Sequence, residues 1–124
     1  LKLYSVPLFP VDGKIVAEEM AELAPVPRYR PELEGLYGRT ARYLGLPTGM
    51  DLYEDKLLVI TYRNAYLYDY SALEEQPKEL LLPLSGQREA ITFGFQTSKI
   101  AYVSRERKNG TEVADIFEII LGHE

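Results

Sequence analysis

The chain has 124 residues and no cysteine, and its 14 lysines and arginines against 19 aspartates and glutamates give a net charge of −5. The absence of cysteine excludes a disulfide scaffold, a cysteine nucleophile and a cysteine-ligated metal site, and the acidic balance argues against a nucleic-acid-binding protein. With 46% hydrophobic and 27% charged residues the composition is typical of a single globular domain over residues 1–124, and no apolar run reaches the roughly 20 residues of a membrane span.

The first part of the chain contains one clear strand pattern and one ambiguous segment. Residues 1–6 predict a strand that is already in progress at Leu1, which suggests a fragment or a processed product. Residues 14–23 suit either a helix or an outer strand, and the strand-rich neighbourhood favours the strand. Residues 24–31 hold three prolines and predict a loop.

From residue 49 onward the two-residue period of β-strands dominates. Tyr66, Tyr68 and Tyr70 alternate with other residues, and short polar turns separate the successive runs. The strongest turn signal is Lys108-Asn109-Gly110, because Asn-Gly readily adopts positive φ angles. The predicted strands cover 49–52, 57–62, 65–70, 79–84, 89–95, 99–104 and 112–121.

This pattern predicts an all-β fold built of antiparallel units, each with about four strands. The most apolar alternating positions should lie between sheets. The residues expected to be buried there are Leu58, Ile60, Ile91, Phe93, Ala101 and Val103.

Two stretches of the chain are similar to each other. Met50 aligns with Glu89 at an offset of 39 residues, and Tyr62 aligns with Glu106 at an offset of 44. A period of roughly 40 to 45 residues with about four strands per unit is typical of the blades of a β-propeller.

The two units also resemble a known group of β-propellers. Residues 48–52 and 57–63 resemble one blade, and residues 87–91 followed by 102–106 resemble the Q-x-E-A-I … Y-V-S-x-E blade of the esterase-like phytase and SdiA-regulated families. The resemblance covers residues 42–121 and implies a partial propeller of about two blades, completed by further blades or by other subunits. It also implies a secreted or periplasmic location.

The innermost strand of each blade lines a central channel, so polar residues near its start are candidate ligands. The resemblance places Glu89 and Glu106 at positions where carboxylates surround the channel, with Asp51 near the start of the preceding unit. Carboxylate oxygens without histidine or cysteine nearby suit Ca²⁺. The alternative is a structural role for these carboxylates, in salt bridges with neighbouring arginines.

Arginines at the same end could instead bind a small anionic ligand such as a phosphate or a carboxylate. These are Arg88, Arg105 and Arg107, together with Arg63, and ordinary ion pairs between strands are the alternative. The tyrosines of residues 62–70 suit packing between sheets better than sugar binding.

Three functions follow as hypotheses. The first is a binding module that meets a ligand or partner at its channel face, around Arg88, Glu89, Arg105 and Glu106. The second is a calcium-dependent phosphoesterase similar to the phytases, and the third is a purely structural interaction domain. The sequence leaves open whether the protein is an enzyme.

Overall fold

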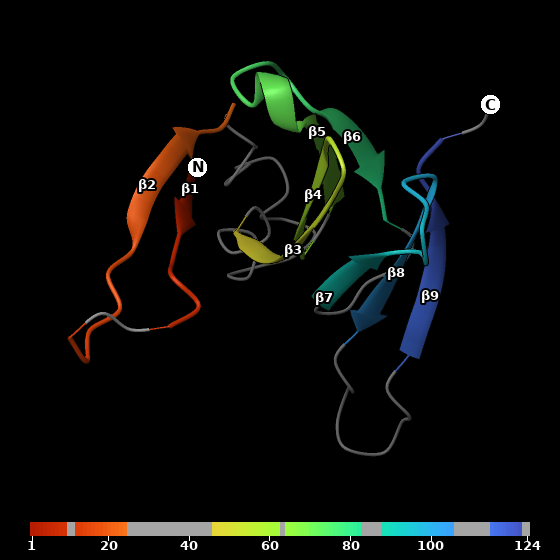
Figure 1. Ribbon diagram of the computed structural model, residues 1–124. Helices are drawn as coiled ribbons and strands as arrows, with labels where there is room; N and C mark the ends of the chain where they lie inside the picture. The colour runs from red at the N-terminus through yellow and green to blue at the C-terminus, as the bar shows by residue number, and fades with distance from the viewer. Residues whose placement is uncertain (10–11, 25–45, 63, 83–87, 106–114, 123–124) are drawn as a thin grey trace, which may run out of the picture.

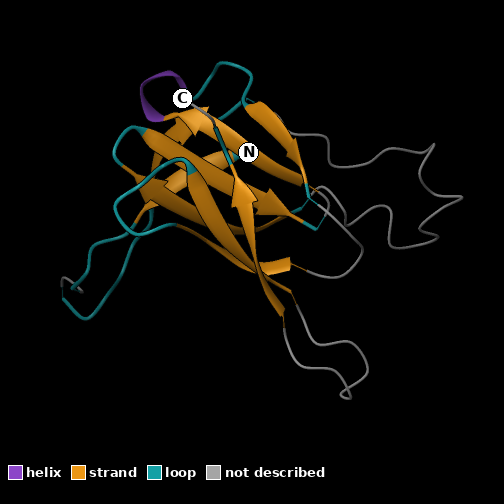
Figure 2. Ribbon diagram, turned by 90° about the vertical axis from the view of Figure 1, so that its right-hand side faces the viewer, coloured by secondary structure: helices purple, strands orange, loops and turns teal. Residues whose placement is uncertain are grey.

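The computed structural model describes residues 1–9, 12–24, 46–62, 64–82, 88–105 and 115–122, and most of this backbone is β-strand. Within these described ranges one short helical turn, Tyr70–Ala72, interrupts the strands (Figure 2). The predicted all-β class is therefore confirmed. The ambiguous segment at 14–23 contains a strand, Glu18–Glu22, as its neighbours indicated.

The described strands form three antiparallel sheets that follow one another along the chain (Figure 1). The first is a hairpin, the second has four strands in sequential order, and the third has three. Their bounds are β1 (Lys2–Ser5) and β2 (Glu18–Glu22); β3 (Pro47–Tyr53), β4 (Lys56–Thr61), β5 (Asn64–Asp69) and β6 (Lys78–Leu81); and β7 (Arg88–Phe93), β8 (Ile100–Arg105) and β9 (Asp115–Ile120). A four-stranded unit is thus confirmed for β3–β6.

Short turns set the register of these strands. Tyr53 lies opposite Lys56, and the intervening Glu54 adopts a positive φ of 52° in the tight turn that joins β3 to β4. At the next turn, the Asn64 N–H donates to Thr61 Oγ1 at 3.1 Å and the Thr61 hydroxyl donates to the Asn64 carbonyl at 3.3 Å. Gln96, with φ 53°, lies in the turn between β7 and β8, in which the Thr97 N–H donates to the Gly94 carbonyl at 3.3 Å. The turns predicted at 54–55 and 96–98 therefore lie between strands. Of the turn predicted at 63–64, Asn64 is the first residue of β5 and residue 63 lies outside the described residues.

The main hydrophobic core lies between the second and third sheets. Alternate residues of β4, among them Leu58 and Ile60, face Ile91 and Phe93 of β7. All six residues predicted to lie between sheets are buried in this one cluster. The cluster consists of Leu58, Ile60, Ala65, Leu82, Ile91, Phe93, Ala101, Val103 and Leu121.

The opposite face of β3–β6 packs against the hairpin β1–β2. Leu57 and Val59 of β4 lie on this face, and with Tyr66 and Tyr68 of β5 they form a second buried cluster with Leu23, Ala24 and Leu73. The middle sheet is therefore covered on both faces. The tyrosines of β5 serve packing between sheets, as their spacing predicted.

Within the described residues, the third sheet is covered on one face only, the face that packs against the middle sheet. On its far face Ile116 and Ile120 are 74% and 55% exposed. The loop predicted at 24–31 lies outside the described residues except for Ala24, and the turn predicted at Lys108–Gly110 lies outside them altogether. Across the described ranges, no helix has the length and apolar character that crossing a membrane requires.

Candidate functional site

The first strands of the second and third sheets lie side by side. A Cβ placed on Gly49 of β3 would come within 3.4 Å of the Ala90 Cα of β7. Further along, the rings of Tyr53 and Phe93 have their centroids 6.1 Å apart. Gly49 thus lies beside Ala90 and Tyr53 beside Phe93, so β3 and β7 run in the same direction.

Asp51 joins these two strands through its carboxylate. The Phe93 N–H donates to Oδ2 at 2.7 Å, and the Thr92 hydroxyl donates to the same oxygen at 3.1 Å. Oδ1 accepts from the Leu52 N–H at 2.9 Å. Both oxygens of this predicted metal ligand therefore already accept hydrogen bonds from the protein, and the carboxylate holds two sheets together.

Arg88 and Arg105 occupy directly opposed positions of β7 and β8. The register shifts between Arg88 and Ala90, so Glu89 is the extra residue of a β-bulge, and its side chain is exposed. Arg105 is half-buried and has an interaction partner. The pairing brings three of the predicted site residues to one end of the third sheet, and bulges often occur beside functional sites.

The predicted metal ligands do not all meet at this end. Asp51 binds the backbone of Phe93, which is four residues from Glu89 along β7, or about 13 Å at the usual strand rise. Glu106, Arg63 and Arg107 lie outside the described residues. Among the residues that the structure describes, no group of three or more His, Cys, Asp or Glu side chains is placed to hold a metal ion.

Two polar residues that form hydrogen bonds between strands were not predicted from the sequence as site residues. Thr92 faces Asp51 across the gap between β7 and β3, and Asn64 donates from Nδ2 to Glu79 Oε1 at 2.6 Å between β5 and β6. Both occupy ordinary strand positions, where threonine and asparagine carry no signal of a tertiary partner.

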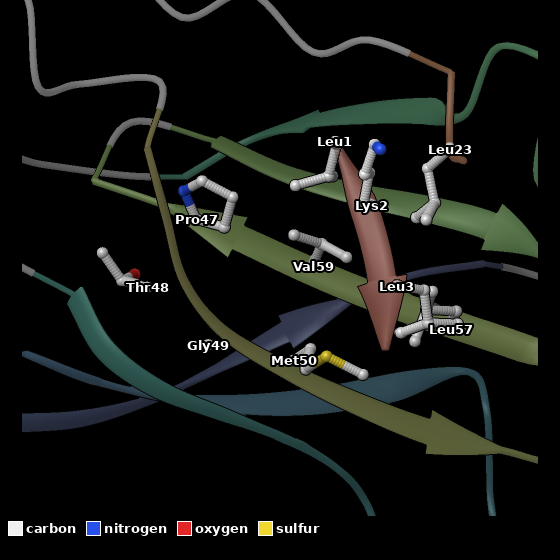
Figure 3. Close-up of a pocket in the computed structure, with 10 residues that line it drawn as sticks. All are labelled: Leu1, Lys2, Leu3, Leu23, Pro47, Thr48, Gly49, Met50, Leu57 and Val59. Carbon is white, nitrogen blue, oxygen red and sulfur yellow. The ribbon is translucent and has the colours of Figure 1, made fainter. Parts of the chain in front are cut away.

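A groove opens on the other side of β3, between this strand and β1 (Figure 3). It has a volume of about 270 Å³ and is lined mainly by apolar side chains, including Leu1, Leu3, Met50, Leu57 and Val59. Thr48 also lines it, and the Thr48 Oγ1 atom is buried without a hydrogen-bond partner among the described residues.

Burial changes the acidity of Tyr68 on β5. Its hydroxyl donates to the Ala24 carbonyl at 2.8 Å, and burial, with a smaller effect of Tyr66, raises the pKa of Tyr68 to about 12. This group therefore stays neutral in the folded protein and links β5 to the segment that follows β2.

Comparison of the chain with protein-family models, curated proteins and solved structures found no match.

Proposed function

We propose that the chain is a binding module of the β-propeller type, with the edge formed by β3 and β7 facing a central channel. The described sheets follow one another in chain order and pack face to face, and the second and third sheets bring their first strands, β3 and β7, side by side. In propellers, four-stranded blades surround a central channel in this manner. The remaining blades would come from further polypeptide or from other subunits.

The bound species we propose is a small anion, or a partner that presents one. The observation that carries this proposal is the register of β7 and β8, which sets Arg88 opposite Arg105 at one end of the sheet. Guanidinium groups are well suited to bind phosphate or carboxylate oxygens in pairs.

Isothermal titration calorimetry with inorganic phosphate tests this function. We expect binding by the intact protein and at least a tenfold lower affinity in Arg88→Gln, about 1.4 kcal/mol for one lost charge-assisted contact. Lys14→Gln is the matched control, because Lys14 is exposed outside the third sheet and its loss changes the net charge equally. Equal affinities of Arg88→Gln and Lys14→Gln, or no phosphate binding at all, would overturn the proposal.

Calcium titration separates this module from the phosphoesterase alternative. Because both oxygens of Asp51 accept hydrogen bonds within the protein, we expect no stoichiometric calcium site that involves this residue. Calcium binding that disappears in both Glu89→Gln and Asp51→Asn would instead favour the phosphoesterase. No observation on the described residues favours that alternative, so the binding module is the function proposed.

A further inference from the structure

The groove between β1 and β3 is bordered by a free strand edge. β1 pairs with β2 on one side only, and within the described residues no strand pairs with its other side. Figure 3 shows β1 passing over Val59 and Leu57 of β4, with Met50 of β3 beside it. Unpaired N–H and C=O groups along such an edge can pair with another strand.

The floor of the groove is apolar and incompletely covered. Met50 and Leu52 pair with Val59 and Leu57 in the register of β3 and β4, so all four side chains lie on the face turned toward the hairpin β1–β2. Val59 and Leu57 are buried, at 4% and 1% exposure, whereas Met50 and Leu52 are 52% and 47% exposed. The hairpin therefore covers β4 and leaves β3 open.

β7, the first strand of the third sheet, occupies the same position in its sheet as β3 does in the second, and its face is covered. Ile91 and Phe93 lie on the face of β7 that is turned toward the preceding sheet, and they are only 7% and 6% exposed. The strands that cover them are β3 and β4. Met50 and Leu52 have the same relation to the hairpin β1–β2, but among the described residues that sheet has no strand in the corresponding place.

We propose that this groove accepts a β-strand of another polypeptide. The strand pairs through its backbone with the free edge of β1 and places alternate apolar side chains on Met50 and Leu52, the two exposed side chains of β3. Backbone pairing provides affinity in this mode of recognition, and the alternate side chains provide specificity. The partner is an extended segment with branched apolar residues at every second position, because Leu58 and Ile60 of β4 do the corresponding packing on β7. This inference rests on the packing of the sheets and is independent of the anion site.

The probe is a synthetic peptide with the sequence of β4, Lys-Leu-Leu-Val-Ile-Thr, extended by one lysine at each end for solubility. We expect this peptide to bind the intact protein and to slow amide hydrogen exchange in residues 2–5. A contact through apolar side chains alone would not slow exchange there, because it does not pair with the β1 backbone. The same peptide with alternate amides N-methylated lacks the donors for pairing and should not protect β1.

Two matched variants locate the contact. Met50→Lys places a charge in the groove, whereas Met20→Lys makes the same change on β2 at a side chain that is equally exposed, 53% against 52%. We expect at least tenfold weaker peptide binding for Met50→Lys and unchanged binding for Met20→Lys, with circular dichroism confirming that both fold.

Three results would overturn the proposal. The first is equal binding by the two variants, and the second is binding without protection of residues 2–5. The third is self-association that Met50→Lys abolishes, measured by sedimentation without peptide, because the occupant would then be a second copy of this chain. Loss of phosphate binding in the calorimetric test would leave this proposal unaffected.

Discussion

Replacing Asp51 by alanine tests the contact between the second and third sheets most sharply. The change leaves the Phe93 N–H without its acceptor at 2.7 Å, beside a side chain that is only 6% exposed. A hydrogen bond to a charged acceptor contributes about 1.5–3 kcal/mol, and an unsatisfied buried donor costs a similar amount. We therefore expect Asp51→Ala to lower the free energy of unfolding by about 2 kcal/mol.

Urea unfolding followed by circular dichroism measures this loss, and two variants bracket it. Asp51→Asn keeps an oxygen that can accept from Phe93 and should lose less. Asp69→Ala removes a carboxylate of the same size whose ion pair with Lys56 is largely exposed, so its cost should stay below about 1 kcal/mol. The reasoning is refuted if Asp51→Ala costs no more than Asp69→Ala.

The remaining predictions concern pH, the core and a tight turn. Because the pKa of Tyr68 is raised to about 12, its contribution to stability is complete below pH 10 and is lost between pH 10 and 12. The unfolding free energy of the wild type should fall over that interval by about 2 kcal/mol more than that of Tyr68→Phe, and parallel pH profiles would contradict this. Leu58→Ala should cost about 2–5 kcal/mol by denaturant titration, since Leu58 is fully buried, and a cost under about 1 kcal/mol would contradict its place in the core. Gly94→Ala would bring a Cβ within 2.6 Å of Ile100 Cγ1, so we expect a loss of about 1–3 kcal/mol, and an unchanged melting temperature would show that Ile100 moves aside freely.

The strands and the main core could be predicted because they depend on local alternation. A residue such as Val103 occupies an apolar position in a two-residue period, and this period alone assigns it to a buried face. Residues 14–23 fit two periods equally well, and only the strand-rich context indicated the correct one. The segment is a strand because it pairs with β1, a contact that local periodicity does not encode.

The site could be predicted only where it follows from strand register. The turn at 96–98 makes β7 and β8 antiparallel, and from this the proximity of Arg88, Glu89 and Arg105 follows directly. Asp51 differs, because its partners Thr92 and Phe93 belong to another sheet and depend on how the two sheets pack. The groove beside β1 was missed for the same reason, since the alternation at Met50 and Leu52 indicates a strand without showing what covers it.

The central claim is that β3 lies beside β7 and runs in the same direction, because the proposed channel edge depends on this arrangement. The most direct measurement is a nuclear Overhauser spectrum of the aromatic protons. The ring centroids of Tyr53 and Phe93 lie 6.1 Å apart with planes inclined by 52°, so we predict cross-peaks between the two rings that disappear in Phe93→Leu. Absence of these cross-peaks in the folded wild-type protein would contradict the arrangement of the sheets.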